Sequence, residues 1–115
     1  MQPAVARAAQ ERWGYASQSS DWRSVVADAA VDVVDITAPN DVHLEIALAA
    51  AAAGKHVYCE KPVGRSLAET AQIAEAARAA GVMTFTGFNY RWMPALQHAR
   101  ALVEDGRLGA LTHFR

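Results

Sequence analysis

The stretch "CEKPVG", Cys59 to Gly64, follows the apolar segment "KHVYC" and holds the residues best suited to chemistry. Glu60 and Lys61 are an acid and a base side by side, and Pro62 restricts the backbone behind them. A lysine at the mouth of a buried strand can aim its ammonium at a substrate oxygen. On a surface turn the same pair would only be a solvated ion pair that contributes little stability. The stretch is therefore either the edge of an active site or a polar turn.

Two other polar segments also follow apolar stretches, at residues 37–40 ("TAPN") and 87–91 ("GFNYR"). Each allows a purely structural interpretation. Asn40 is suited to cap the helix expected after it, although its amide could do so and still line a cleft. His43 could be a surface or packing histidine, and Arg91 could lie at the start of a helix that packs against the sheet. These alternatives stay open from the residues alone.

Cysteine and histidine give no sign of a metal centre. The single cysteine, Cys59, excludes a disulfide and a multi-cysteine metal site within one chain. It fits a small buried hydrophobe at the end of its strand. A nucleophilic role would need a nearby base, and the nearest histidine in sequence, His56, belongs to the same strand. Metal-ligand spacing is missing from the histidines, so we predict no metal; they are His43, His56, His98 and His113.

The periodicity of the chain alternates between strand and helix. Apolar, β-branched runs predict buried strands at 31–37, 55–59 and 82–87. Helices are expected between them, at 42–54 with Gly54 as its stop and at 66–81 with Gly81 at its end. Ser66 and Glu69 have the spacing of a capping box. Strands that alternate with capped helices predict right-handed βαβ crossovers and a parallel sheet.

The two ends of the chain add further elements. A helix is predicted up to Gly14, and a short one follows with Asp21 or Ser20 as its cap. Residues 93–106 predict another helix, and the alternation in "ALTHFR", residues 110–115, predicts a half-buried strand.

The polar segments converge on one edge of this predicted sheet. Ligands of open parallel α/β sheets bind in the crevice beyond the carboxyl ends of the strands. Residues 37–40, 60–62 and 87–91 all follow carboxyl ends, whereas the amino ends carry only ordinary flanking polar residues. The sequence therefore predicts a site along the carboxyl edge.

Composition excludes several other classes of function. The net charge of −1 gives no electrostatic case for nucleic acid or an anionic membrane. The longest apolar run, Ile46–Ala53, is far shorter than the roughly 20 residues that cross a bilayer. The first residues do not have the pattern of a signal peptide, so we expect a cytoplasmic protein.

Three motifs, in order, carry a resemblance to a known family. They are T-x-P-N-x-x-H from Thr37, G-K-H-V-x-C-E-K-P from Gly54 and G-F-N-Y-R-x-x-P from Gly87. Over about residues 21–115 the sequence resembles the glucose-fructose oxidoreductase and inositol dehydrogenase family, called Gfo/Idh/MocA. Members pair an NAD(P)-binding Rossmann domain with a C-terminal α+β domain.

The resemblance implies an α/β fold, a partial Rossmann-type doubly wound parallel sheet. Residues 1–90 would form a truncated NAD(P)-binding domain that lacks the first strand, the glycine-rich loop and the second strand. Residues 91–115 would form a linking helix and the first strand of a truncated C-terminal α+β domain. No G-x-G-x-x-G occurs in the 115 residues, and the family's D-x-x-x-H pair with its catalytic histidine is also missing. The chain is therefore expected to be an internal fragment.

The resemblance also assigns roles to individual residues. Lys61 would be catalytic and reach the substrate hydroxyl, and the Lys61–Pro62 bond would be cis. Tyr90 and Arg91 would lie on the substrate side. The residues expected to bind NAD or NADP are Thr37, Pro39, Asn40, His43, Glu60, Lys61, Pro62 and Asn89.

The implied activity is hydride transfer between a nicotinamide and a secondary alcohol of a sugar, cyclitol or similar polyol. The full-length parent is expected to be a homo-oligomer, whereas the chain alone is expected to show little or no turnover. A different class of function is a non-catalytic binding or interaction module derived from the same fold; an in-frame glycine-rich fingerprint upstream of Met1 would distinguish the two. An unrelated flavodoxin-like or response-regulator-like module would have acidic strand ends, which this chain does not have.

We predict that the isolated chain is marginally folded, prone to aggregation or dependent on a partner. A sheet without its central strand leaves backbone groups unpaired at an edge and apolar helix faces uncovered. Thermal unfolding followed by circular dichroism should therefore be broad or end in aggregation. A sharp, cooperative transition from a monomer would contradict this prediction.

Overall fold

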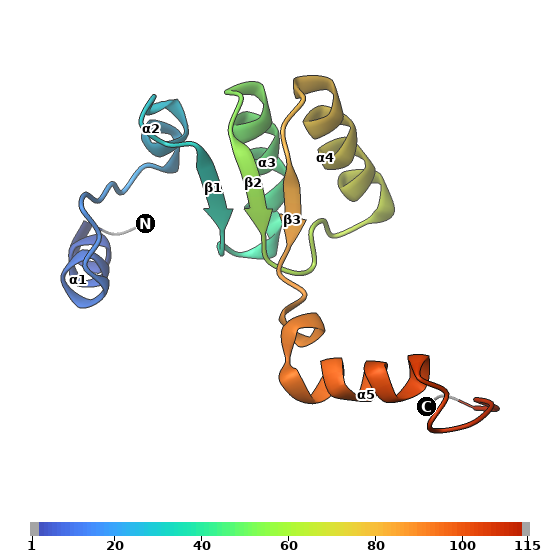
Figure 1. Cartoon of the computed structure of the whole chain (residues 1–115). Coiled ribbons are helices and arrows are strands. Elements are labelled where there is room, and N and C mark those ends of the chain that lie inside the picture. Colours follow the sequence, from blue (N-terminus) through green and yellow to red (C-terminus); the bar gives the residue numbers. More distant parts are fainter. Residues whose placement is uncertain (1–2, 114–115) are drawn as a thin grey trace.

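A computed structural model describes residues 3–113 and contains a three-stranded parallel sheet (Figure 1). Its strands lie in chain order, β1-β2-β3, with bounds Val33–Ile36, His56–Cys59 and Thr84–Thr86. Val34 pairs with Val57, which in turn pairs with Thr84. The predicted α/β fold with a parallel sheet of the Rossmann type is confirmed, with strands shorter than the apolar runs suggested.

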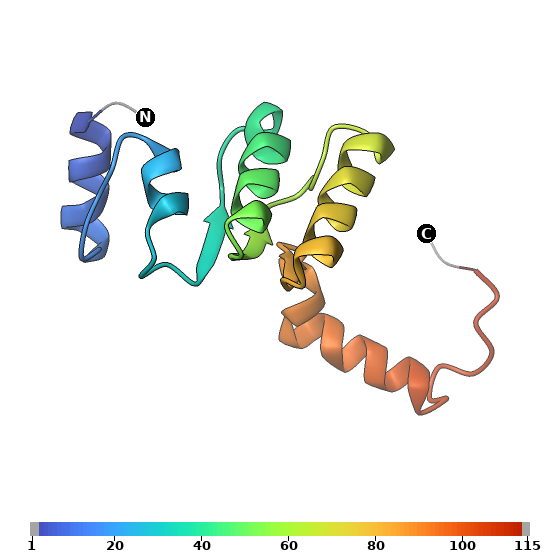
Figure 2. The ribbon, with the colours of Figure 1, turned by 90° about the horizontal axis from the view of Figure 1, so that it is seen from above.

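Two helices cover one face of the sheet, α3 (His43–Ala52) and α4 (Leu67–Ala80), as Figure 2 shows from above. The side chains of alternate strand residues point toward these helices, among them Val34, Ile36 and Val57, all buried. The facing side of α3 is mostly alanine, and Ala50 is completely buried. Small side chains let the helix axis approach the sheet closely, so α3 contacts β1, β2 and α4 at once.

The opposite face of the sheet is exposed among the described residues. Val33 and Phe85 retain 55% and 47% of their surface, which is unusual for apolar residues of a parallel sheet. On this face Tyr58 stacks on Phe85 with ring centroids 5.2 Å apart, and Phe85 stacks on Trp92 at 6.5 Å. The face is therefore apolar and aromatic, with only short-range stacking to shield it.

Local signals decide where several helices begin and end. The short helix α2 (Trp22–Ala27) is capped by Asp21, whose carboxylate accepts a hydrogen bond from the Arg23 N–H at 3.0 Å, so the cap is Asp21 and not Ser20. Gly81 ends α4 in the left-handed conformation, with φ of 67°, which favours glycine. The first helix, α1 (Pro3–Trp13), begins three residues before the helix-like pattern of residues 6–13 and stops before Gly14.

The predicted capping box at α4 forms in a modified way. Ser66 Oγ accepts from the Glu69 N–H at 3.2 Å, as expected. The Glu69 carboxylate, however, accepts from the backbone N–H of Arg65 at 2.7 Å, one residue further out, and also binds the Arg65 guanidinium. The hydrogen bond to that guanidinium is the main cause of a lowered pKa of Glu69. Its contribution to stability is therefore present at neutral pH and is lost as acid protonates the carboxyl.

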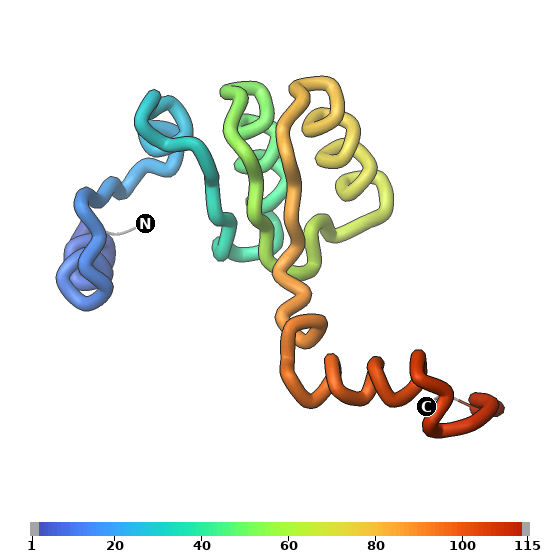
Figure 3. The backbone as a smooth tube through the Cα atoms, in the orientation of Figure 1, coloured from blue at the N-terminus to red at the C-terminus, as the bar shows by residue number. Residues whose placement is uncertain are grey.

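The last helix, α5 (Pro94–Glu104), lies away from the sheet, as the tube in Figure 3 shows. It follows the 3₁₀ turn η2 (Asn89–Trp92) and packs against it, while Leu96 and Val103 stay exposed. The radius of gyration is 18.3 Å, against about 13 Å for a compact chain of this length. The described residues thus form a small α/β layer with extended arms.

The strand predicted at 110–115 does not form in its described part, residues 110–113. Residues 110–113 are not in a strand, and 114–115 lie outside the described residues. A strand is stable only when its backbone pairs with another strand, and no partner lies beside this segment within residues 3–113. Among the same residues, no helix has both the length and the apolar character needed to span a bilayer.

The alanine face of α3 gives a direct test of the packing. Ala50→Leu inserts three carbons where no space is left. The free energy of unfolding, measured in urea, should therefore fall by about 1–3 kcal/mol. Ala52→Leu, at an exposed position of the same helix, is the matched control and should change stability by less than about 0.5 kcal/mol. Equal effects of the two substitutions would contradict the close approach of α3 to the sheet.

Candidate functional site

Backbone hydrogen bonds continue beyond the strands and hold the three carboxyl ends in register. The Glu60 N–H donates to Ile36 O at 2.9 Å, and the Gly87 N–H donates to Cys59 O at 2.9 Å. The segments that follow β1, β2 and β3 therefore start from one rigid edge. This is the edge at which the sequence predicted a site.

Glu60 and Lys61 do not form an ion pair. The Glu60 carboxylate accepts from the backbone N–H of Lys61 at 3.0 Å. The Lys61 side chain is exposed and makes no hydrogen bond or ion pair with any residue from 3 to 113. The interpretation of this turn as a solvated Glu–Lys pair is therefore wrong, and the ammonium is available to a ligand. The Lys61–Pro62 peptide bond is cis, as predicted.

Gly87 provides the space that Glu60 occupies. A Cβ atom at Gly87 would lie 2.9 Å from Glu60 Oε1 and 3.0 Å from its carboxyl carbon, closer than such contacts allow. The residue is buried, and it directly follows β3. Sequence reasoning included Gly87 in a polar segment but did not recognise this role, which depends on a residue 27 positions earlier in the chain.

His43 lies inside the protein. Its side chain has no exposed surface, Nε2 is 2.9 Å from Ala38 O and Nδ1 is 2.9 Å from Pro62 O. Of the interpretations left open by the sequence, that of a surface histidine is wrong and that of a packing histidine is confirmed. The ring presents no surface to a cleft in this structure, so a contribution to cofactor binding would be made through the backbone that it contacts.

Cys59 is buried as expected, with 2% of its surface exposed. Its Sγ lies 3.5 Å from His43 Nδ1, so the nearest imidazole is that of His43 and not that of His56. Burial raises the pKa of the Cys59 thiol, and the negative charges of Glu60 and Asp35 raise it further. A buried thiol kept protonated is a poor nucleophile.

The segment after β1 carries two polar side chains that make no hydrogen bond within the described residues. Thr37 and Asn40 are exposed, and the 3₁₀ turn η1 (Asn40–Val42) joins β1 to α3. Neither η1 nor α3 has a side-chain cap, so the expectation that Asn40 caps the helix is wrong. The chain enters α3 through the 3₁₀ turn, in which the His43 N–H donates to Asn40 O, so the cap position does not fall on Asn40. Its amide makes no hydrogen bond with the described residues.

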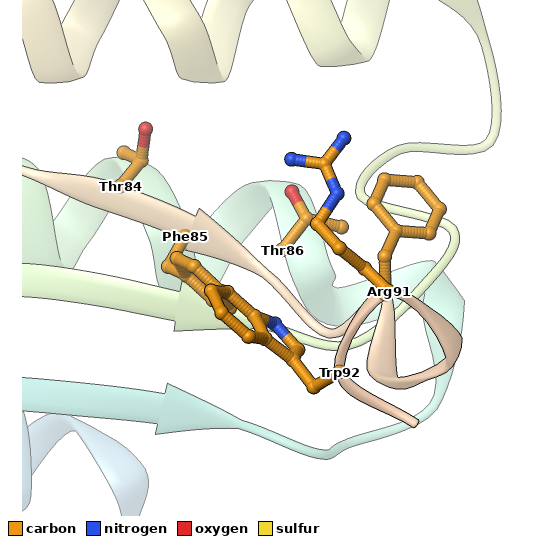
Figure 4. A pocket seen from close by; sticks show the side chains of 6 residues that line it. Thr84, Phe85, Thr86, Arg91 and Trp92 are labelled. Carbon is orange, nitrogen blue, oxygen red and sulfur yellow. The ribbon is translucent and has the colours of Figure 1, made fainter. Parts of the chain in front are cut away.

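The segment after β3 turns through η2, where Tyr90 and Arg91 are exposed. Figure 4 shows an open pocket here: Phe85 and Trp92 lie on one side of β3, and Arg91 extends along the other, near Thr86. The pocket has a volume of about 290 Å³. Residues 91 and 92 thus end a 3₁₀ turn and do not start an α-helix, and it is Trp92 that packs against the sheet.

The edge carries charges of both signs, with the Glu60 carboxylate beside several positive groups. The N-terminal ends of α3 and α4 follow the carboxyl ends of β1 and β2, and helix N-termini carry partial positive charge. Lys61 and Arg91 add two side-chain cations that form no ion pair within the described part of the chain. The same residues, 3–113, contain no group of three or more side chains suited to hold a metal ion.

A parallel α/β sheet with free polar groups and cations at its carboxyl edge is the architecture of a nucleotide-binding domain. Residues 1–88 match the model of the GFO_IDH_MocA family, described as an oxidoreductase family with an NAD-binding Rossmann fold. The chain belongs to this family, as the three motifs indicated.

Several of the relatives with names are dehydrogenases of sugars or cyclitols. The chain is 42% identical over 113 residues to levoglucosan dehydrogenase of Pseudarthrobacter phenanthrenivorans, covering 98% of the chain and 29% of that enzyme. It is 34% identical to myo-inositol 2-dehydrogenase of Thermotoga maritima, covering 90% and 31%. A solved structure of levoglucosan dehydrogenase in complex with NADH and levoglucosan superposes with a TM-score of 0.88, at 42% identity, over 94% of this chain and 29% of the other. The chain therefore spans less than a third of these relatives.

The space that Gly87 leaves for the Glu60 side chain can be tested by Gly87→Ala. The new methyl group should displace the carboxylate and break its hydrogen bond to the Lys61 N–H. Because the obstacle is the tip of a flexible side chain, stability should fall by only about 1 kcal/mol, the low end of overpacking costs. Hydrogen exchange at the Lys61 amide should nevertheless become faster.

Glu60→Ala provides the control, because it removes the obstacle. Adding Gly87→Ala to this variant should change neither stability nor Lys61 exchange further, as expected for two residues that act through one contact. Additive effects would mean that Gly87 is needed for another reason.

Proposed function

We propose that this chain forms the nicotinamide side of the active site of an NAD(P)-dependent oxidoreductase that acts on a secondary alcohol of a sugar, cyclitol or similar polyol. The observation that carries the proposal is Lys61, an exposed and unpaired ammonium on a turn anchored at the carboxyl edge of the sheet. The substrates named for the relatives, levoglucosan and myo-inositol, are neutral polyols and support this substrate class.

The edge suits a dinucleotide, because such ligands bind beyond the carboxyl ends of parallel strands and the N-terminal end of α3 lies there. The cofactor, NAD or NADP, would supply the hydride acceptor or donor. Tyr90 and Arg91 would border the substrate. The residues proposed to line the cofactor side are Thr37, Pro39, Asn40, Glu60, Lys61, Pro62 and Asn89, with His43 acting from beneath them.

Lys61 is proposed to act on the substrate hydroxyl. Its ammonium would donate a hydrogen bond to the substrate oxygen and stabilise negative charge there as the proton leaves. The Glu60 carboxylate would keep the Lys61 backbone in place through its bond to the Lys61 N–H. Arg91, at the neighbouring strand end, would bind substrate hydroxyls without taking part in proton transfer.

This chain does not contain all the groups that such a reaction needs. Its 115 residues include no G-x-G-x-x-G to hold the pyrophosphate, and they span 29% of levoglucosan dehydrogenase. We therefore propose that it is an internal segment of a longer, cytoplasmic and homo-oligomeric enzyme. The phosphate-binding loop and the principal proton-transfer histidine would be supplied by other segments. The isolated chain should show little or no turnover.

A non-catalytic interaction module is the second candidate, and the open aromatic face of the sheet favours it. Tyr58, Phe85 and Trp92 would then serve a protein partner and not the packing of an enzyme core. The DNA around the reading frame distinguishes the two: an in-frame glycine-rich fingerprint upstream supports the enzyme, and its absence supports the module.

Replacement of Lys61 tests the enzyme. In the intact gene product, Lys61→Ala should lower kcat by about 10²- to 10³-fold, the usual cost of removing one donor that stabilises developing negative charge, with a smaller change in KM for the cofactor. Absorbance of the reduced nicotinamide measures the rate, with NAD⁺ or NADP⁺ and levoglucosan, myo-inositol or D-xylose.

Lys55→Ala is the matched control for this experiment. Lys55 lies at the opposite, amino end of β2, where its Nζ donates to Asp28 O at 2.9 Å. This variant should retain the kcat of the wild type. A Lys61→Ala variant with unchanged kcat would overturn the proposed role of the lysine.

A further inference from the structure

The imidazole of His43 joins two segments that carry residues of the candidate site. It begins α3, and its two ring nitrogens lie 2.9 Å from Ala38 O and 2.9 Å from Pro62 O. Ala38 belongs to the segment after β1, and Pro62 to the turn after β2. One side chain therefore connects the ends of two adjacent strands at the edge where the ligand is expected.

Burial gives the contacts of the His43 ring with the two carbonyl oxygens a structural reason. The ring has no exposed surface, and burying a polar group without hydrogen bonds is unfavourable because its lost hydration is not replaced. Carbonyl oxygens only accept hydrogen bonds, and a neutral imidazole donates from one nitrogen only. A neutral ring therefore donates a hydrogen bond to only one of the two carbonyl oxygens. Variants that keep a donor at one ring position can test each contact separately.

The Pro62 contact bears directly on Lys61. The Lys61 side chain makes no hydrogen bond or ion pair in residues 3–113, so its direction depends on its backbone. That backbone is held on one side by the Glu60 carboxylate, at the Lys61 N–H, and on the other by His43, at the carbonyl of Pro62. The two anchors flank the lysine.

We propose that His43 is a positioning residue, which fixes the direction of Lys61 through a hydrogen bond from Nδ1–H to Pro62 O. The proposal rests on the function proposed above for Lys61. His43 would touch neither substrate nor cofactor; it would act by keeping the 60–62 turn in the position that aims the ammonium. In this tautomer Nε2 carries no proton, so it makes no hydrogen bond to Ala38 O.

Two amide variants separate the contacts. The shorter amide of His43→Asn can place a donor near the position of Nδ1, and the longer amide of His43→Gln places one near that of Nε2. In the intact gene product, with levoglucosan or myo-inositol and NAD⁺, His43→Gln and His43→Ala should lower kcat by about 10- to 100-fold, as expected when a reacting group is misplaced. His43→Asn should stay within about threefold of the wild type, and KM should change little in all three.

A double-mutant cycle with Lys61→Ala distinguishes positioning from general destabilisation. If His43 acts through Lys61, His43→Gln should lower kcat no further in the Lys61→Ala background. The same loss of kcat in both backgrounds would overturn the proposal, as would equal losses for the two amide variants. If Lys61→Ala alone keeps the wild-type kcat, the proposed function of the lysine fails, and with it the role given to His43.

Hydrogen exchange gives a measurement that needs no substrate. In His43→Gln, the amides of Glu60 and Lys61 should exchange at least about tenfold faster, while those of α4 and β3 keep their wild-type protection, because the opening is local. In His43→Asn, exchange at Glu60 and Lys61 should match the wild type. If His43→Gln speeds exchange throughout the sheet and helices, or leaves Glu60 and Lys61 unchanged, His43 only packs.

Discussion

The close approach of α3 to the sheet is the constraint on which the carboxyl edge depends. Its alanine face, with Ala47 and Ala50 almost or completely buried, lets the helix start directly beneath the ends of β1 and β2. Only from that position does the first residue of the helix, His43, reach the backbone of both neighbouring segments. A bulkier face would move the helix outward and separate the two segments that the ring connects.

At the carboxyl edge of the sheet, buried and exposed groups have different roles. Buried or half-buried residues, His43, Glu60 and Gly87, bind or accommodate one another and the backbone. Exposed residues, Lys61 and Arg91 among them, make no hydrogen bonds or ion pairs through their charged ends within residues 3–113. In such an arrangement the exposed groups can form their hydrogen bonds and ion pairs with a ligand. The buried layer below fixes their positions, as sites for small molecules require.

Much of the fold could be predicted from the sequence, because its signals are local. Apolar runs identified β1, β2 and β3, and Ser66, Gly81 and Asp21 marked helix ends through hydrogen bonds or φ angles within a few residues. The failures have tertiary causes. Residues 110–113 form no strand without a partner, Asn40 lost its cap to a 3₁₀ turn, and the contacts of His43 and Gly87 involve residues 19 and 27 positions away. No local pattern indicates such pairs.

The attachment of α5 at one end only allows small rotations there to move its far end over a larger distance. The helix meets the rest of the chain at η2, which is held to the sheet by the stacking of Trp92 on Phe85, and its own apolar residues stay exposed. Eleven residues of α-helix extend about 16 Å from this hinge. A rotation of about 10° at Met93 would thus sweep the far end of α5 through about 3 Å. Whatever packs on the exposed apolar residues of α5 therefore sets the angle between α5 and the turn that carries Tyr90 and Arg91.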